Sequence, residues 1–266
     1  MAGTVKHDSW GMGRSYDHYM GRWSRLIAAE FLHWLGAPEN AEWVDIGCGT
    51  GALTQTILEA GNPRSVIGIE PSEGFVAHAR GHVADPRVRF ELAGAEALPL
   101  DDNSVDVAVS GLVLNFVPDK PGALREMRRV TRPGGTISFY VWDYPGGGMG
   151  FIDAFWKAAA EIDPAARALD EADRFPFCTP TGLEHICAEA GVGNVTVRPI
   201  EVATTFADLE AFWHPFTLGA GPAPGYCMSL SEDKRSELKA QLARTLSSEE
   251  AISLPARAWA VRASST

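Results

Sequence analysis

Hydrophobic residues change their spacing several times along the first half of the chain. Apolar residues recur at helical spacing from Trp23 to Leu35 and stop at Gly36. Short runs rich in valine and isoleucine then alternate with helical segments. The expected strands are 42–46, 65–70, 87–92, 105–110 and 136–142, with helices at 52–59, about 72–82 and 120–130. Strands that alternate with helices predict a parallel sheet with right-handed crossovers.

The pattern is less regular after residue 142. Glycines 146–148 begin a flexible stretch, and Thr179 and Pro180 suit the N-cap and first turn of a helix. The expected elements are helices at 151–162 and 180–190 and strands at 195–202 and 256–262. The longest run without charge, 211–231, contains three prolines and three glycines, so we expect a loop or lid there rather than a membrane span.

Charge and cysteine content exclude several classes. The 266 residues carry 23 Lys and Arg against 34 Asp and Glu, a net charge of −11, which argues against a nucleic-acid partner. The four cysteines form no C-x-x-C pair and no cluster with zinc spacing, so we expect no metal site and a reducing compartment. The N-terminus has no apolar signal segment, and we expect a cytoplasmic protein that does not enter a membrane.

A glycine-rich turn follows the first expected strand. Gly47, Gly49 and Gly51 allow sharp turning and the close approach of an adenosine-type cofactor, whose binding is favoured by the backbone N–H groups at a helix start. Glu70 ends the second strand, where an acid binds ribose hydroxyls in such folds. The loop alone fits a dinucleotide as well as other adenosine cofactors.

Four motifs in the same order reduce this ambiguity. Residues 44–51, Val-Asp-Ile-Gly-Cys-Gly-Thr-Gly, resemble the first motif of class I S-adenosylmethionine-dependent methyltransferases, in which an acid such as Asp45 before the first glycine is typical. Residues 68–72 resemble the second motif, 93–106 the adenine-side segment with the fourth strand, and 132–135 the turn before the fifth strand. The resemblance is to the small-molecule branch that includes the ubiquinone and menaquinone methyltransferases.

The resemblance implies an α/β, Rossmann-like fold. Its seven-stranded, mostly parallel sheet has helices on both faces and an antiparallel last strand, and an N-terminal helix and lid insertions are added. It implies S-adenosylmethionine as cofactor, S-adenosylhomocysteine as product, and in-line methyl transfer to a small molecule. The implied cofactor residues are Tyr19, Arg22, Asp45, Gly47, Gly49, Gly51, Glu70, Pro71, Ala95, Glu96, Ser110, Gly111 and Leu112. One position departs from the branch, because Gly94 stands where an aspartate usually binds adenine.

The methyl acceptor is expected to be apolar or aromatic. The expected pocket wall consists of Trp142, Phe212, Trp213 and Phe216. His214 and His18 are the candidate general bases, and Asn115 suits either a polar site position or a helix start. The residues leave open whether oxygen, nitrogen or carbon is methylated. A nicotinamide-dependent oxidoreductase and a non-catalytic S-adenosylmethionine-binding protein are the alternatives.

The expected domain plan is a single α/β domain. It has an N-terminal cap helix at 1–38, a cofactor-binding core at 39–145 and the remainder of the core at 146–266. Two insertions, 146–178 and 207–250, are expected to act as lid and substrate segments. The sequence does not predict the oligomeric state.

Overall fold

The chain folds into two compact units. The structure, a computed structural model, describes residues 17–219, 221–246 and 251–265. Unit 1 draws on residues 1–23, 143–176 and 201–257, and unit 2 on residues 24–142, 177–200 and 258–266. The one-domain plan expected from the sequence stays a prediction.

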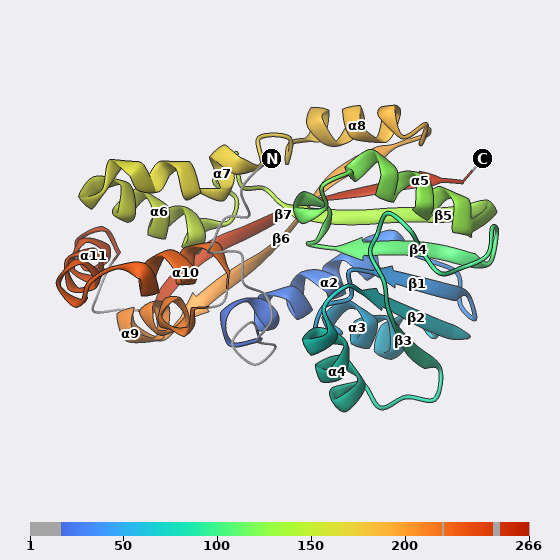
Figure 1. Ribbon diagram of the computed structural model, residues 1–266, viewed down its shortest axis with the longest axis horizontal. Coiled ribbons are helices and arrows are strands. Elements are labelled where there is room, and N and C mark those ends of the chain that lie inside the picture. Colours follow the sequence, from blue (N-terminus) through green and yellow to red (C-terminus); the bar gives the residue numbers. More distant parts are fainter. Residues whose placement is uncertain (1–16, 220, 247–250, 266) are drawn as a thin grey trace. The chain divides into compact units, whose positions relative to one another are not determined.

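Seven strands form one sheet in the order β3-β2-β1-β4-β5-β7-β6 (Figure 1). The strands are β1 (Glu42–Ile46), β2 (Ser65–Glu70), β3 (Val88–Leu92), β4 (Val105–Gly111), β5 (Thr131–Trp142), β6 (Thr196–Phe206) and β7 (Ile252–Ser264). Neighbours from β3 to β5 pair in parallel, whereas β7 pairs with β5 in the antiparallel sense. The expected seven-stranded sheet with an antiparallel last strand is confirmed.

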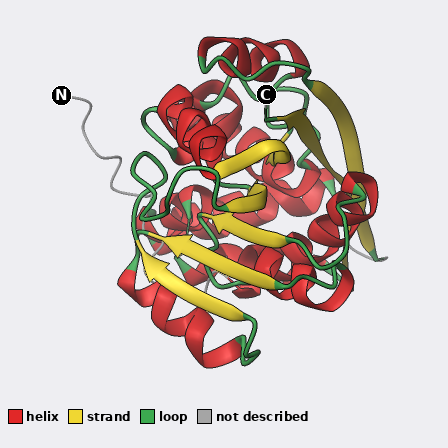
Figure 2. Ribbon diagram, turned by 90° about the vertical axis from the view of Figure 1, so that its right-hand side faces the viewer, coloured by secondary structure: helices red, strands yellow, loops and turns green. Residues whose placement is uncertain are grey.

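Unit 2 surrounds its strands with helices, and Figure 2 shows helices on both faces of the strand layer. They are α2 (Arg22–Leu35, from residue 24 on), α3 (Ala52–Ala60), α4 (Glu73–His82), η2 (Leu114–Phe116), α5 (Lys120–Val130) and α8 (Pro180–Glu189). Side chains of Trp43, Val44 and Val107 are almost fully buried, which explains why the strands read as apolar runs. Asp45 lies opposite Gly68 on one neighbouring strand and Val109 on the other.

Unit 1 contains mainly short helices. They are η1 (Asp17–Gly21), α6 (Gly150–Ile162), η3 (Pro164–Leu169), α7 (Glu171–Arg174), α9 (Leu209–Trp213), η4 (His214–Leu218), α10 (Pro222–Ser229) and α11 (Glu232–Thr245). The expectation of a loop at 211–231 is therefore wrong. Proline at the first turn of a helix costs no hydrogen bond, so Pro215 and Pro222 help to begin η4 and α10 instead of preventing them.

An aromatic cluster forms the core of unit 1. Its rings come from six aromatic side chains, Tyr19, Phe151, Phe155, Phe206, Phe212 and Phe216. Phe155 and Phe216 stack with ring centroids 4.4 Å apart, and Phe206 and Phe212 meet edge to face at 5.1 Å. All six side chains are at most 2% exposed, so packing accounts for their presence.

None of the helices in the described ranges is both long enough and apolar enough to cross a membrane.

Candidate functional site

The glycine turn of unit 2 links β1 to α3 through three left-handed backbone positions. Gly47, Gly49 and Gly51 have φ of 72°, 54° and 92°. A Cβ on Gly47 would lie 2.4 Å from Cγ1 of Val113, so only glycine fits there. A Cβ on Gly49 would meet nothing within 4 Å, so the turn borders open space at its middle glycine. The turn thus has one closed side and one side open to a ligand.

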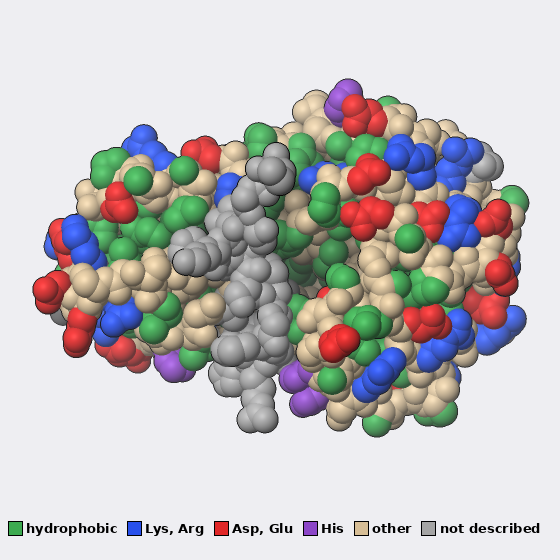
Figure 3. Space-filling model, viewed as in Figure 1, with side chains coloured by type: hydrophobic (Ala, Val, Ile, Leu, Met, Phe, Trp, Pro, Cys, Tyr) green, Lys and Arg blue, Asp and Glu red, His purple; other side chains and the backbone are tan. Residues whose placement is uncertain are grey.

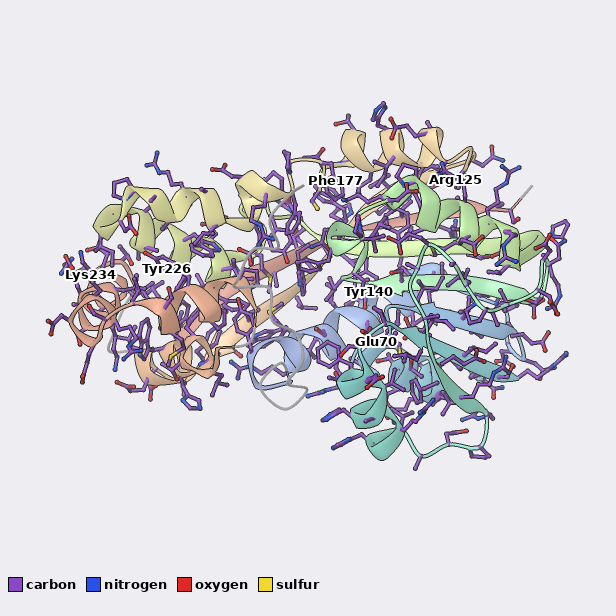
Figure 4. All side chains as sticks on the ribbon, in the orientation of Figure 1. Glu70, Arg125, Tyr140, Phe177, Tyr226 and Lys234 are labelled. Atoms are coloured by element: carbon purple, nitrogen blue, oxygen red, sulfur yellow. The ribbon has the colours of Figure 1, made fainter. Side chains whose placement is uncertain are left out.

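The Glu70 carboxylate braces this turn from the end of β2. Its Oε2 accepts a hydrogen bond from the Gly49 N–H at 3.1 Å, and its Oε1 accepts one from the Ser72 N–H at 3.0 Å. The side chain is 7% exposed, and this burial raises the pKa of Glu70. Figure 4 labels Glu70, which lies at the carboxyl end of its strand, the edge where ligands bind in open α/β sheets.

The Asp45 side chain is buried beneath the same turn. Its Oδ2 accepts a hydrogen bond from the Thr54 hydroxyl at 2.6 Å, while its Oδ1 has no partner in the described ranges. The pKa of Asp45 is raised to about 7, chiefly by burial and in smaller part by the nearby Glu70 carboxylate. Asp45 therefore anchors the start of α3 and keeps one buried oxygen available.

Asp45 and Glu70 form an acidic pair without a cation. Within the described part of the chain, no Lys or Arg forms a salt bridge with either carboxylate. Buried carboxylates with raised pKa values are stabilised by a positive ligand and destabilised by a negative one. The site is thus suited to a cationic group beside a sugar rather than to a pyrophosphate.

The end of β4 adds a strained backbone to this edge of the sheet. Leu112 has φ of 63°, a left-handed conformation that residues with a side chain seldom adopt. Its N–H donates to the Tyr140 carbonyl at 2.8 Å, and the side chain of Ser110 is buried. Val113 closes the Gly47 side of the turn, a role that the sequence analysis missed because a valine after a strand is not a distinctive signal.

The adenine-side segment follows β3. Ala95 is half-buried, whereas Glu96 and Pro71 are exposed. The Glu96 Oε2 lies 3.3 Å from where a Cβ on Gly94 would stand. The carboxylate of Glu96 thus reaches toward the position where the related methyltransferases carry an aspartate.

The remaining predicted residues belong mostly to unit 1. Tyr19, Phe212 and Phe216 are part of the aromatic cluster, and Trp213 contacts Phe216 with ring centroids 6.4 Å apart. The ring of His214 is exposed and forms no hydrogen bond or ion pair with a described residue. Trp142, in unit 2, is buried opposite Ala258 of β7, and the side chain of His18 lies outside the described residues. Their roles toward an acceptor stay predictions.

Arg22 is the cation of unit 1 with an unusual setting. Its guanidinium lies 4.0 Å from the Trp23 ring centroid and 4.8 Å from that of Phe206. Its Nε is buried without a partner among the described residues, and desolvation lowers its pKa. A half-buried guanidinium of this kind is stabilised by an anionic ligand.

The surface charges of unit 2 compensate one another. Arg129 pairs with Glu126 and Asp102, and Arg132 pairs with Glu42 and Asp106. Figure 3 accordingly shows acidic and basic side chains interspersed on the drawn face. In the ranges that the structure describes, no three His, Cys, Asp or Glu side chains group so as to hold a metal ion.

Comparison with known proteins identifies the motif-bearing part of unit 2. Residues 44–139 match a family described as a methyltransferase domain. The chain is 42% identical over 98 residues to the demethylmenaquinone methyltransferase of Shouchella clausii, covering 35% of this chain and 42% of that one. It is 35% identical over 125 residues to the malonyl-[acyl-carrier protein] O-methyltransferase of Pectobacterium atrosepticum, covering 47% of each.

A solved structure shares the fold over most of the chain. An N-methyltransferase of Haemonchus contortus in complex with S-adenosylhomocysteine superposes with a TM-score of 0.58 at 14% identity, covering 95% of this chain and 56% of that one. The chain spans less than half the length of the two curated relatives. The family match and the motif order agree with the sheet: residues 44–139 are similar to a methyltransferase domain, and the strand order is the one expected from the motifs.

Proposed function

We propose that this protein transfers a methyl group from S-adenosylmethionine to a small-molecule acceptor. The observation that carries the proposal is the Asp45–Glu70 acidic pair beside the open side of the glycine turn. Asp45 Oδ1 is a buried acceptor that has no partner in the described part of the chain, and the cofactor offers an ammonium group that needs an acceptor. The residues present therefore fit this cofactor.

Charge also weighs against the nicotinamide alternative. A dinucleotide brings a pyrophosphate with two negative charges to the glycine turn, where Asp45 and Glu70 already place two carboxylates. S-adenosylmethionine instead brings a sulfonium and an ammonium. The names of the relatives and the matched domain likewise favour a methyltransferase over an oxidoreductase or a protein that only binds the cofactor.

Each part of the cofactor has a proposed partner in unit 2. Glu70 would accept hydrogen bonds from the ribose hydroxyls in exchange for one of its backbone partners, and the open side of Gly49 would admit the sugar. Glu96 and the backbone of Ala95 would bind the adenine amino group in place of the absent aspartate. Backbone groups of Ser110, Gly111 and Leu112 would face the methionine part.

Tyr19 and Arg22 are proposed as further cofactor residues. The Nε of Arg22, which has no hydrogen-bond partner among the described residues, suits the methionine carboxylate, and this supports the prediction made from the N-terminal aromatic and basic pattern. The proposal requires no covalent enzyme intermediate. The bound cofactor supplies an activated methyl group and its leaving group, so the protein acts by aligning the acceptor and excluding water.

The acceptor is proposed to be a small apolar or aromatic molecule, with Trp142, Phe212, Trp213 and Phe216 as candidate contacts and His214 as candidate base. Methyl-labelled S-adenosylmethionine, incubated with wild-type protein and metabolite fractions, tests the activity. Incorporation of label that Asp45→Asn and Glu70→Gln abolish is the expected result. Label incorporation that both variants retain would contradict the site, and no incorporation with any fraction would contradict the activity.

A further inference from the structure

The segment after β4 contains a buried amide nitrogen that has no partner among the described residues. Asn115 lies in η2 and is 3% exposed. Its Nδ2 has no hydrogen-bond partner in residues 17–219, 221–246 or 251–265. An unsatisfied buried donor destabilises a fold, whereas an apolar side chain of the same size would not. The local structure therefore gives no reason for an asparagine at this position.

A helix-start role does not explain the residue either. The N-cap of η2 is Val113, and no side chain caps this helix. Asparagine at a cap is useful because its side chain accepts from a backbone N–H, and Asn115 makes no such bond. Of the two roles that the sequence left open for Asn115, the structural one has no supporting contact.

The surroundings place Asn115 beside the cofactor turn. Leu112, three residues earlier, holds the strained left-handed backbone, a feature that tends to occur at functional sites. Val113, two residues earlier, packs against Gly47 so closely that a Cβ there would lie 2.4 Å away. Both residues follow the carboxyl end of β4, the edge of the sheet where ligands bind. Asn115 thus follows within three residues of two tightly constrained positions at this edge of the sheet.

The Nδ2 atom of Asn115 is a hydrogen-bond donor, and this polarity indicates whether its partner is the cofactor or the methyl acceptor. The sulfonium and the ammonium of the cofactor are cations, which the Asp45 and Glu70 carboxylates complement and an N–H donor does not. The cofactor's carboxylate would have another source of donors in the backbone N–H groups of the first turn of α3, whose N-cap Gly51 has no capping side chain. An N–H donor pairs best with an electron-rich oxygen, and such an oxygen would belong to the methyl acceptor.

We infer that Asn115 donates a hydrogen bond to the acceptor, and that the acceptor is an oxygen acid, a carboxylic acid or a phenol, methylated on oxygen. The inference rests on the proposed function. A charge-assisted hydrogen bond favours the anionic form of the acceptor, whose proton leaves to solvent before transfer. The acceptor oxygen then forms the O–CH3 bond as the S–CH3 bond breaks, and the electron pair of that bond stays on sulfur. The products are a methyl ester or ether and the neutral thioether.

A matched set of acceptors tests the inference. Phenol, catechol, benzoate and benzylamine share one ring and differ in the heteroatom, and each is incubated with methyl-labelled S-adenosylmethionine and wild-type protein. Labelling of a phenol or of benzoate with little labelling of benzylamine is expected. Wild-type protein that labels only benzylamine, or that labels none of the oxygen acids, overturns the inference.

Variants at this position separate an acceptor role from a cofactor or structural role. Asn115→Leu removes the donor at similar volume, and Asn115→Gln keeps it. We expect Asn115→Leu to lower kcat/KM for the oxygen acid roughly 10–100-fold. S-adenosylhomocysteine affinity stays within about twofold and the melting temperature is equal or higher. Asn115→Gln recovers part of the rate.

Three results would overturn the inference: an Asn115→Leu variant that is as active as wild type, one that melts at a clearly lower temperature, and one that binds S-adenosylhomocysteine at least roughly tenfold more weakly. Failure of the proposed function has a different signature. In that case wild-type protein itself does not bind S-adenosylhomocysteine, and the Asn115 variants are compared on the melting temperature alone.

Discussion

The glycine turn of unit 2 and the aromatic cluster of unit 1 are both buried, but they differ in what burial leaves unsatisfied. The cluster consists of rings that contact one another, and Phe155, Phe212 and Phe216 are fully buried. The turn borders carboxylates with raised pKa values and an acceptor atom without a partner. Packing accounts for the burial of the rings in the first region, whereas the second region keeps polar atoms for which we propose a ligand as partner.

This difference is informative because both regions were predicted from the sequence as binding surfaces. Full burial of Phe212 and Phe216 leaves little surface for an acceptor, so an unpartnered polar atom or a strained backbone is a better guide to binding than an aromatic run. If this difference holds, substitutions in the aromatic cluster should lower stability, and substitutions at the glycine turn should lower cofactor affinity.

Phe216→Ala is expected to have the largest effect on stability. Removing a ring that is 0% exposed leaves a cavity among Phe155, Phe212 and Tyr19, which lowers the free energy of unfolding by roughly 3–5 kcal/mol. The exposed neighbour His214 provides the control, because His214→Ala should change stability by less than about 0.5 kcal/mol. Denaturant titration measures both, and a stable Phe216→Ala variant with no methyl transfer would make the cluster a substrate surface.

Two glycine variants within the turn come next. Gly47→Ala combines the left-handed backbone with a clash against Val113, so we expect the free energy of unfolding to fall by roughly 2–4 kcal/mol. The methyl group of Gly49→Ala meets open space. Only the left-handed backbone then opposes the substitution, and the free energy of unfolding should fall by about 1 kcal/mol. Thermal unfolding compares their stability, and calorimetry compares their affinity for S-adenosylhomocysteine.

The affinity of the Gly49→Ala variant distinguishes a binding turn from a structural one. Its methyl group would occupy the side that we assign to the cofactor, so affinity should fall more than stability does. A Gly49→Ala variant that binds S-adenosylhomocysteine as tightly as wild type would show that the cofactor does not bind at this turn.

Glu70→Gln should weaken S-adenosylhomocysteine binding roughly 10–100-fold, because a charged acceptor for the ribose hydroxyls becomes neutral. Glu59→Gln is the matched control, since Glu59 is an exposed residue of α3 whose carboxylate accepts a hydrogen bond from Gln55. Isothermal titration calorimetry measures both variants. Equal affinities for the two variants would exclude Glu70 from the ribose site.

The smallest expected effect is a pH dependence set by Asp45. Because burial raises its pKa to about 7, the residue gains its charge between about pH 6 and 8, and S-adenosylmethionine affinity should rise up to about tenfold over that range. Stability should change in the opposite direction. The pKa lies well above the usual value of an aspartate, so the folded state binds the proton more tightly and loses stability as the pH rises from about 4 to 7.

Asp45→Asn serves as the control for this pH dependence. The variant keeps a hydrogen-bond acceptor for Thr54 but cannot ionise, so both pH profiles should become flat. Affinity measured at about pH 6, 7 and 8 checks the expectation. A wild-type affinity that does not depend on pH would show that Asp45 does not meet the cationic part of the ligand.

Sequence patterns predicted the sheet well because its strands are strongly apolar and separated by clear stop signals. The motifs likewise predicted the positions of Gly47, Gly49 and Glu70, since each has a local reason to be that residue. The loop expected at 211–231 was predicted wrongly, because Pro215 and Pro222 were taken as residues that prevent a helix, although they occupy first turns of helices.

Other features have no local signal in the sequence. The contact between Val113 and Gly47 and the unpartnered amide of Asn115 depend on how β1 and β4 lie side by side. Whether a side chain such as Phe212 packs or binds depends on its neighbours in space, which are distant along the chain. Hydrophobic spacing alone does not distinguish these cases.

The central claim is that the acidic glycine turn binds S-adenosylmethionine rather than a nicotinamide dinucleotide. Titration calorimetry of wild-type protein with S-adenosylhomocysteine and, separately, with NAD+ tests it most directly. We predict saturable one-to-one binding of S-adenosylhomocysteine that Glu70→Gln weakens, and no heat of binding with NAD+. Saturable binding of NAD+ together with no binding of S-adenosylhomocysteine would contradict the assignment.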